Sequence, residues 1–508
     1  MARIILSFLW TLIIAGMTAC GSEPSNPTRD TVMVPMRDGT GLATDLYFPG
    51  SGSPPYPLVL IRTPYNKEWM PGYGQYYAQA GFAVALQDVR GRWASEGEWV
   101  PFVHEAEDGY DAIEWLASQE WCTGKVGMVG GSYSGTAQFA AAILKPPHLV
   151  TIVPNVAAAM PDANIPRDGG VLALGWALRW ADIIETARTG HDLQAKVQHS
   201  IQADWTGPLS GLPVIDLDRT IVGREVSYFR DWVTHEPGDD YWDSVEFLEG
   251  LEQVDIPVFL QSGWFDPGTR GTRLAFEHLI RGGNRHVRMI LGPWAHGDRG
   301  RRDLNGIDMG AEAERDLMSE YRKWLEFFLM TDAHDVADEP GVELYVMGRN
   351  RWISGPEYPP AAVQIRPLFL AGAPGSEAPG KLAWHRPTLA DAADVFTYDP
   401  SKPTPSFHAA IKRGALDEYR ARVDAGNDVL IYESSPVDEP FDVVGPIKMK
   451  LHASSSAKDT DFTVTLYGLT PKGEARVLGL TFGILRARYR DSLTRPSLMD
   501  PGTVYPFT

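Results

Sequence analysis

The stretch Gly130-Gly131-Ser132-Tyr133-Ser134-Gly135 lies between a short apolar run, Val126 to Val129, and an alanine-rich run, Ala137 to Leu144. This order predicts a buried strand, a tight turn and a helix, and the turn holds the Ser132 hydroxyl where a neighbouring imidazole can remove its proton. Small residues suit such a turn because the helix must pack back closely onto its strand. An ordinary glycine-rich turn is the alternative, since Gly supplies 50 of the 508 residues.

Two later apolar runs each lead to a residue that a serine nucleophile needs. Ile256 to Leu260 leads to Asp266, and Val287 to Leu291 leads to His296. An α/β-hydrolase places its acid and its histidine after the serine in this order, at the ends of later strands. We therefore predict a catalytic triad of Ser132, Asp266 and His296, in which the imidazole activates the hydroxyl and the carboxylate fixes the imidazole tautomer. Taken singly, the aspartate also fits a turn, and the histidine also fits a surface or core position.

Further strings match motifs of a known family. They are Arg62 to Lys67, Gln87 to Arg92 with Ser95 to Gly97, Gly130 to Gly135, Gly263 to Asp266, and Gly292 to Gly297. Through them the chain resembles the CocE/NonD serine hydrolases, from about Val32 almost to its end. That family includes cocaine esterase, the α-amino-acid ester hydrolases and the X-prolyl dipeptidyl aminopeptidases.

The resemblance implies an oxyanion hole formed by the Tyr65 hydroxyl and the backbone N–H of Tyr133. Tyr65 follows the apolar run Leu58 to Ile61, which suits a position beside the serine turn, and a core tyrosine is the alternative. Asp88 and Arg90 end another predicted strand. A loop-stabilising ion pair is the commoner outcome for such residues.

The predicted fold is an α/β-hydrolase domain with an inserted helical cap, followed by an all-β domain. Strands and helices alternate over residues 31–161 and 250–335, which predicts a mainly parallel sheet covered on both faces, after a first hairpin from Thr31 to Tyr47. Residues 162–249 are helical in pattern and rich in Trp and Tyr, as expected of a cap. Our candidates for an apolar acyl pocket in this cap are Trp176, Trp180, Phe229 and Trp232, and the core of the cap itself is the alternative for each.

Residues 340–508 change to β patterning. Apolar and polar residues alternate around Ile447 to Ala453 and Phe462 to Leu466, which predicts an antiparallel sandwich. The resemblance implies a jelly roll similar to galactose-binding modules. Relatives usually continue past Pro501 to Thr508, so we expect either a truncated sandwich or an incomplete sequence. Open strand edges in a truncated sandwich favour a homodimer or aggregation.

Residues 1–20 have the order of a bacterial lipoprotein signal peptide. Arg3 precedes the apolar run Ile4 to Ile14, and small residues precede Cys20. Residues 21–30 then form a tether, and lipidation of Cys20 predicts an exported protein, periplasmic or at the cell surface, with membrane contact only through the lipid. Met17 stands where such signals usually carry a branched aliphatic residue, so ordinary cleavage and an uncleaved anchor stay open. Cys122 is expected to be an inert buried thiol.

Composition and motifs limit the partners. The 65 Asp and Glu against 46 Lys and Arg give a net charge of −19, which argues against nucleic acid and against a polybasic membrane patch. The sequence has no Walker phosphate loop, no H-E-x-x-H and no paired C-x-x-C, so we expect no metal and no organic cofactor.

The leading hypothesis is a serine hydrolase that cleaves esters, or amides, of small acyl substrates through an acyl-enzyme. Amino-acid ester hydrolases hold the substrate ammonium with acidic residues, some just after the catalytic Asp, but Asp266 is followed by Pro267, Gly268 and Thr269. An X-Pro dipeptidyl-peptidase also needs an anionic group for a free N-terminus, and the sequence reveals none. These two activities are the alternatives within the family. A non-catalytic surface lipoprotein that binds glycan through its C-terminal domain is the alternative outside it.

Overall fold

The computed structural model describes residues 28–508 apart from 159–164, 188–199, 201–202, 204, 298, 305, 332–340, 373–378, 388–392, 405–417, 420, 422, 424–427, 470–474 and 477–481. The signal peptide predicted over residues 1–20, with Cys20, lies outside this part, as do residues 21–27 of the predicted tether. None of the helices in the described ranges is long and apolar enough to cross a membrane.

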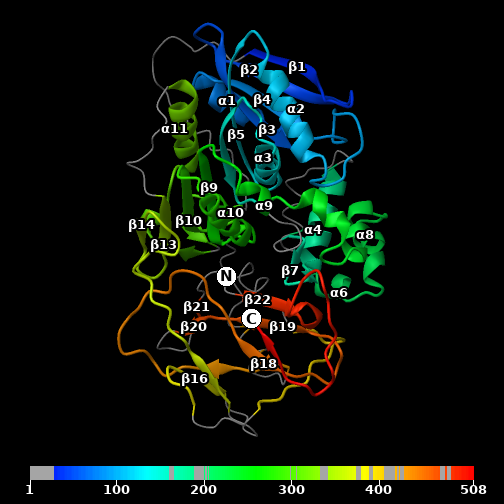
Figure 1. Cartoon of the computed structure of the whole chain (residues 1–508), viewed down its shortest axis with the longest axis vertical. Coiled ribbons are helices and arrows are strands. Elements are labelled where there is room, and N and C mark those ends of the chain that lie inside the picture. Colours follow the sequence, from blue (N-terminus) through cyan, green and yellow to red (C-terminus); the bar gives the residue numbers. More distant parts are fainter. Residues whose placement is uncertain are drawn as a thin grey trace, which may run out of the picture.

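A ten-stranded mixed sheet forms the centre of the described chain, in the order β1-β2-β4-β3-β5-β6-β9-β10-β13-β14 (Figure 1). The strands from β4 to β13 in this order run parallel, and antiparallel pairs close both ends. The bounds are β1 Thr28–Pro35, β2 Gly41–Phe48, β3 Tyr56–Thr63, β4 Ala83–Asp88, β5 Cys122–Gly131, β6 Leu149–Asn155, β9 Val258–Phe265, β10 Val287–Ala295, β13 Val342–Val346 and β14 Arg351–Gly355. The parallel sheet and the first hairpin are confirmed, and the hairpin already begins at Thr28.

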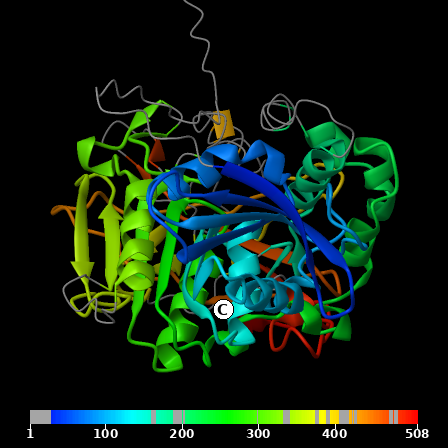
Figure 2. The same cartoon turned by 90° about the horizontal axis from the view of Figure 1, so that it is seen from above.

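Helices cover both faces of this sheet because successive side chains of each strand point to opposite sides. In β3, Leu58 and Leu60 join the apolar core on one face, whereas Val59 and Ile61 join the core on the other. The first face packs against α2 (Glu105–Ala117), α3 (Tyr133–Ile143) and α10 (Thr269–Arg281), and the second against α1 (Pro71–Gln79) and α11 (Leu317–Met330). Seen from above, the blue strands at one end cross the direction of the yellow-green strands at the other, as expected of a twisted sheet (Figure 2).

The segment between β6 and β9 is helical, as predicted for the cap, and lies to one side of the sheet (Figure 1). Its regular elements are β7 Arg167–Asp168, β8 Val171–Leu172, α4 Leu174–Ala187, α6 Thr206–Leu209, η2 Val214–Asp216, α7 Leu217–Ile221, α8 Ser227–Thr234, η3 Asp240–Val245 and α9 Leu248–Leu251. The last of these, α9, packs on α3 and α10, which anchors the cap to the sheet's helical layer.

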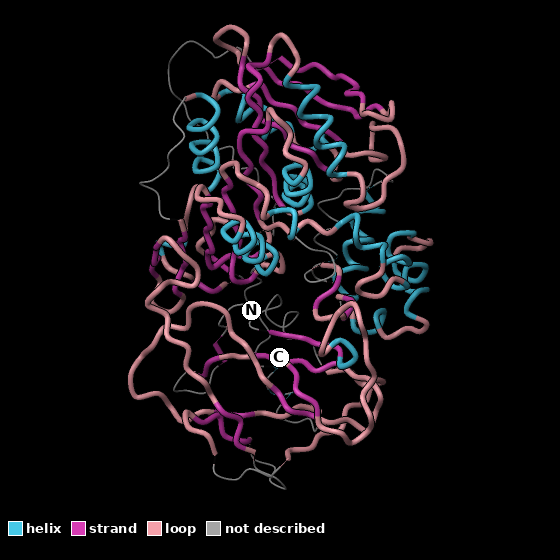
Figure 3. The backbone as a smooth tube through the Cα atoms, viewed as in Figure 1, coloured by secondary structure: helices cyan, strands magenta, loops and turns pink. Residues whose placement is uncertain are grey.

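The C-terminal region is built of short strands and loops, and it forms the lower part of the tube in Figure 3. The strands are β15 Phe369–Ala371, β16 Gly380–Ala383, β17 Tyr432–Glu433, β18 Leu451–Ala453, β19 Asp461–Thr465, β20 Gly468–Leu469, β21 Ala475–Arg476, β22 Phe482–Arg486 and β23 Tyr505–Phe507. In the described residues they pair in twos and threes, so the β character agrees with the prediction while the jelly-roll topology stays a prediction. Two strands that the sequence assigns to this domain, β13 and β14, extend the main sheet instead.

The remaining regular elements are short. They are η1 Lys67–Trp69, β11 Asp303–Leu304, β12 Ile307–Asp308, η4 Ala311–Ala313 and η5 Ala487–Tyr489. Cys122, at the start of β5, is a free buried thiol as expected, and burial raises its pKa.

Candidate active site

The serine turn has the predicted order of strand, turn and helix. Ser132 follows β5 directly and precedes α3, with φ 60° and ψ −127°, a backbone conformation that non-glycine residues adopt mainly where function requires it. Its N–H donates to the Asn155 carbonyl at the end of the neighbouring strand β6, at 2.9 Å. A Cβ at Gly131 would meet the Arg299 guanidinium and the Asn155 side chain, which explains why glycine precedes the serine.

The Tyr65 hydroxyl lies 3.4 Å from Ser132 Oγ. Tyr65 follows β3, the strand beside β5, so the two residues leave the same edge of the sheet. Burial raises the pKa of the Tyr65 phenol, and hydrogen bonds from Ser132, Trp180 and the backbone of Tyr133 oppose that rise. The two predicted oxyanion donors and the serine are therefore neighbours in the structure.

The side chain of Tyr133 points away from this edge into the protein. Its hydroxyl donates to Glu105 Oε1 at 2.8 Å and accepts from the backbone N–H of Phe102 at 2.9 Å. Glu105 in turn forms an ion pair of 2.6 Å with Arg62, and both side chains are buried. Burial raises the pKa of Glu105, and the Arg62 charge opposes that rise. This ion pair fixes the ring of Tyr133, which leaves the Tyr133 backbone N–H as the group available to an oxyanion.

Asp266 and His296 form the second pair. They follow β9 and β10, which are adjacent parallel strands with Phe265 opposite Ala295, so both leave the same edge. Asp266 Oδ2 lies 2.8 Å from His296 Nδ1, and Asp266 Oδ1 accepts the Gly268 N–H at 2.5 Å. Because an ionised carboxylate can only accept, a neutral imidazole in this contact carries its proton on Nδ1 and offers Nε2 as the proton acceptor.

The structure thus holds the predicted residues as two pairs, Ser132 with Tyr65 and His296 with Asp266. Both pairs lie at the carboxyl-terminal edge of the same parallel sheet, and no hydrogen bond joins the pairs among the described residues. A contact between Arg299 and Asn155 links the loop after His296 to the strand end that holds Ser132. Catalytic hydrogen bonds are often long before substrate binds, so the lack of a bond between the pairs does not exclude the triad. The catalytic roles of Ser132, Asp266 and His296 stay predictions.

Aromatic side chains of the cap gather beside Tyr65 and Tyr133. Trp180 stacks on Trp176 with ring centroids 5.7 Å apart, and it lies parallel to the Tyr133 ring at 6.4 Å. Both tryptophans are half-buried, as a place in a pocket requires. Phe229 has no exposed surface and Trp232 only 2%, so these two candidates lie in the core of the cap, the alternative weighed for each.

Trp99 and Glu105 lie beside the site but were not predicted from the sequence, whereas their neighbour Arg92 ends the matched string Gln87 to Arg92. Trp99 donates its indole N–H to the Tyr133 hydroxyl at 3.2 Å, and the guanidinium of Arg92 lies 4.7 Å over the Trp99 ring. The contacts of Glu105 are described above. Trp99 and Glu105 come from the loop and helix after β4, and only their closeness to the matched string could have drawn attention to them.

Asp88 and Arg90 do not pair with each other. Arg90 forms ion pairs with Asp108 at 2.5 Å and Asp38 at 2.7 Å. Asp88 instead accepts the backbone N–H of Lys67 at 2.8 Å, which ties down the loop that carries Tyr65. Burial raises the pKa of Asp88 to about 6.

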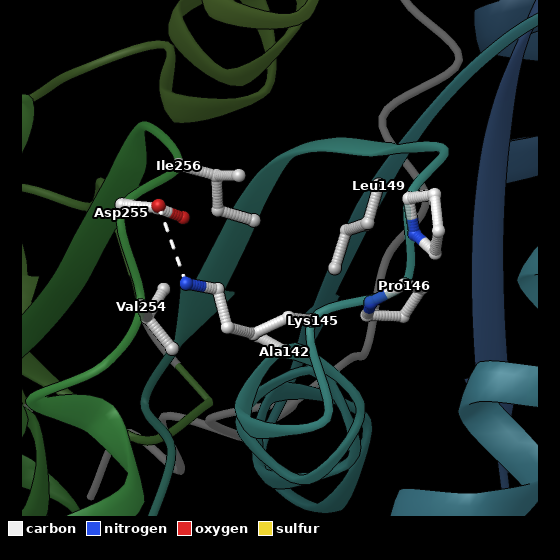
Figure 4. A pocket seen from close by; sticks show the side chains of 8 residues that line it. Ala142, Lys145, Pro146, Leu149, Val254, Asp255 and Ile256 are labelled. Atoms are coloured by element: carbon white, nitrogen blue, oxygen red, sulfur yellow. Dashed lines mark hydrogen bonds and ion pairs between the residues drawn. The ribbon is translucent and has the colours of Figure 1, made fainter.

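Two cavities of the described surface, of about 200 Å³ and 240 Å³, lie away from these residues. The first is lined by the loop after α3 and the segment before β9, and Lys145 reaches across it to Asp255 at 3.3 Å (Figure 4). Loops that precede parallel strands lie at the amino-terminal edge of the sheet, opposite Ser132. Within the described ranges, no three His, Cys, Asp or Glu side chains are placed to hold a metal ion.

Known proteins are similar to this chain over most of its length. Residues 38–298 match the X-Pro dipeptidyl-peptidase (S15) family, and residues 334–508 match the C-terminal non-catalytic domain of X-Pro dipeptidyl-peptidases. The cocaine esterase of Rhodococcus sp. (strain MB1 Bresler) is 32% identical over 499 residues, which cover 93% of this chain and 85% of the esterase.

Two solved structures share the fold. An α-amino acid ester hydrolase superposes with a TM-score of 0.77 at 22% identity, covering 99% of this chain and 89% of the other. An aminopeptidase from a Thaumarchaeota archaeon superposes with a TM-score of 0.75 at 22% identity, covering 98% and 87%. With its two matched domains and the identity to cocaine esterase, this chain belongs to the CocE/NonD family of serine hydrolases.

Proposed function

We propose that this serine hydrolase cleaves carboxylic esters through an acyl-enzyme on Ser132. His296 Nε2 takes the proton of the hydroxyl as Ser132 attacks the ester carbonyl, and Asp266 stabilises the imidazolium that forms. The same imidazolium then protonates the leaving alcohol. Water, activated by His296 in its turn, hydrolyses the acyl-enzyme and releases the acid.

The negative oxygen of the tetrahedral intermediate binds between the Tyr65 hydroxyl and the Tyr133 backbone N–H. The observation that carries the proposal is the Tyr65 hydroxyl at 3.4 Å from Ser132 Oγ. A donor at that position stabilises charge that appears on the oxygen only after attack, which is how preorganised donors accelerate acyl transfer.

An apolar, aromatic acyl group fits the surroundings better than a charged one. Trp180 is half-buried beside Tyr65, and the half-buried Trp176 stacks on it, so that the two rings offer flat apolar surface. Glu185 is the cap carboxylate bonded to the neighbouring Tyr228, at 3.3 Å, and Arg224 pairs with it. Its charge is thus already balanced, which disfavours a role in holding a substrate ammonium. The cocaine esterase relative is in keeping with an ester substrate.

Release of X-Pro dipeptides from the N-terminus of peptides is the second candidate, because both matched domains carry the name of the X-Pro dipeptidyl-peptidases. The deciding experiment compares p-nitrophenyl esters of aliphatic and aromatic acids, aminoacyl esters and X-Pro anilides on the full chain, with Ser132→Ala as control. Hydrolysis of aromatic acyl esters that disappears in the variant supports the proposal. Preference for X-Pro anilides selects the second candidate, and undiminished hydrolysis by Ser132→Ala removes both.

A further inference from the structure

Arg92 is a buried cation, 1% exposed, at the junction of the sheet, the cap and the candidate active site. Its Nε donates to the carbonyl of Pro64 at 3.1 Å, and its Nη2 donates to the carbonyl of Ile184 at 3.3 Å. Its guanidinium also lies over the rings of Trp99, at 4.7 Å, and Trp93, at 5.4 Å. One side chain thus contacts the loop after β3, the last turn of α4 and the aromatic cluster.

The contact with Pro64 fixes the peptide unit that joins Pro64 to Tyr65. The Pro64 carbonyl accepts from Arg92 and also from the Trp93 indole N–H at 2.9 Å. On the other side of the same peptide bond, the Tyr65 N–H donates to Thr63 Oγ1 at 3.1 Å. Since the peptide unit is planar and the φ angle of proline is nearly fixed, these bonds set where the Tyr65 side chain starts.

The contact with Ile184 extends this arrangement to the cap. The last four carbonyls of a helix lack partners within the helix, and Ile184 belongs to the last four residues of α4. A cation at that end also interacts favourably with the helix dipole. Arg92 therefore holds the cap helix that carries Trp180 against the loop that carries Tyr65.

The positive charge of Arg92 also favours Tyr65 as a hydrogen-bond donor to the oxyanion. Burial raises the pKa of the Tyr65 phenol, and the positive charge of Arg92 is among the influences that lower it. A phenol whose ionised form is favoured donates a stronger hydrogen bond to an oxyanion. Charges act over longer distances inside a protein than in water, because the local dielectric constant is low.

We propose that Arg92 is a positioning residue for ester hydrolysis, which holds Tyr65 at the oxyanion and fastens the cap helix α4 to it. The inference rests on the proposed function, because it gives Arg92 a role only through Tyr65. A purely structural arginine would stabilise the fold without favouring one donor of the oxyanion hole.

A double-mutant cycle on the full chain tests this inference. Arg92→Met, Tyr65→Phe and the double variant are compared with the unaltered protein for kcat and KM on the best p-nitrophenyl ester. Tyr65→Phe is expected to lower kcat about 10²- to 10³-fold, as loss of one oxyanion donor does. Arg92→Met is expected to lower kcat about 10- to 100-fold with little change in KM, because a catalytic group displaced by about 1 Å loses that much.

The two changes must be coupled if Arg92 acts through Tyr65. In the Tyr65→Phe background, Arg92→Met is then expected to cost less than about threefold, well short of the additive result for independent sites. If Arg92→Met lowers kcat by the same factor in the unaltered protein and in the Tyr65→Phe background, the inference is overturned. If Tyr65→Phe itself leaves kcat unchanged, or Ser132→Ala still turns over, the proposed function fails instead, so the two failures are distinguishable.

Two further variants separate positioning from stability. Arg92→Lys keeps the charge but cannot bridge two carbonyls and stack on a ring, so it should recover part of the lost kcat and serves in the cycle if Arg92→Met does not fold. Arg288→Met is the matched control, since Arg288 also lies over a ring, that of Phe259 at 4.8 Å, and is largely buried. It precedes His296 by eight residues, about 26 Å along an extended strand. It should lower Tm and leave kcat unchanged, whereas a fall in kcat that matches Arg92→Met overturns the inference.

Discussion

Replacement of Asp266 by asparagine tests the geometry of the second pair most directly. Asparagine has the same shape, so its Oδ1 can still accept the Gly268 N–H that Asp266 holds at 2.5 Å. The other oxygen, 2.8 Å from His296 Nδ1, becomes an NH₂ group. Two donors cannot share that contact, so the imidazole must carry its proton on Nε2, and Nε2 can no longer accept the proton of Ser132.

The expected cost is large for the reaction and small for the fold. The wrong tautomer lowers kcat about 10⁴-fold in a serine triad, which corresponds to about 5 kcal/mol of transition-state stabilisation. Stability changes by about 1 kcal/mol, the net value of one hydrogen bond, because no cavity opens and the carboxylate is replaced by a group of equal size. The Asp266→Asn variant should therefore lose most of its kcat while its unfolding free energy changes little.

The measurement is kcat on a p-nitrophenyl ester at about pH 8, where an ordinary imidazole is neutral, with thermal unfolding recorded in parallel. Asp255→Asn is the control, because Asp255 is three-quarters exposed and pairs with Lys145 at the opposite edge of the sheet. That control should keep the full rate. A kcat for Asp266→Asn within about tenfold of the unaltered protein would refute the assignment of Asp266 and His296 as a catalytic pair.

Three other substitutions test the support of the site. Asp88→Asn should alter the pH dependence of stability. The pKa of Asp88 is raised to about 6, so the folded protein binds this proton more tightly than the unfolded chain does between about pH 4 and 6. The unfolding free energy of the unaltered protein therefore falls by about 3 kcal/mol as pH rises through that window. Urea unfolding on both sides of the window should show this fall removed in the variant, and a pH-independent difference from the unaltered protein would contradict the prediction. Glu105→Ala should lower the unfolding free energy by about 3 kcal/mol in urea titrations, since it removes the carboxylate 2.6 Å from the buried Arg62 and leaves Asp108, at 3.8 Å, as a more distant counter-charge. A loss under about 1 kcal/mol would show that Asp108 balances this charge. Gly131→Ala should cost about 1–3 kcal/mol and slow fluorophosphonate labelling of Ser132, because its methyl group meets the Arg299 guanidinium; an unchanged labelling rate would mean that Arg299 moves aside freely.

The sequence by itself determined the parts of this protein that depend on neighbouring residues. Short continuous apolar runs that alternate with helical patterns predicted the strands of the parallel sheet, and the small residues around Ser132 predicted the strand, turn and helix, because the allowed backbone conformations are set locally. The order of Ser132, Asp266 and His296 followed from the same pattern, since strand ends in a parallel sheet share one edge.

Only the tertiary structure decided what depends on docking between distant segments. Trp176, Trp180, Phe229 and Trp232 each fit either a pocket or the core of the cap from sequence alone. The packing of α4 against α8 buries Trp232 and Phe229 and leaves Trp180 beside Tyr65. In the same way, β13 reads as part of the C-terminal domain until its register with β10 places it in the main sheet. The contacts of Arg92 with Pro64 and Ile184 join positions 28 and 92 residues apart. No periodicity marks such pairs, because burial and hydrogen bonding are settled only when the folded surfaces meet.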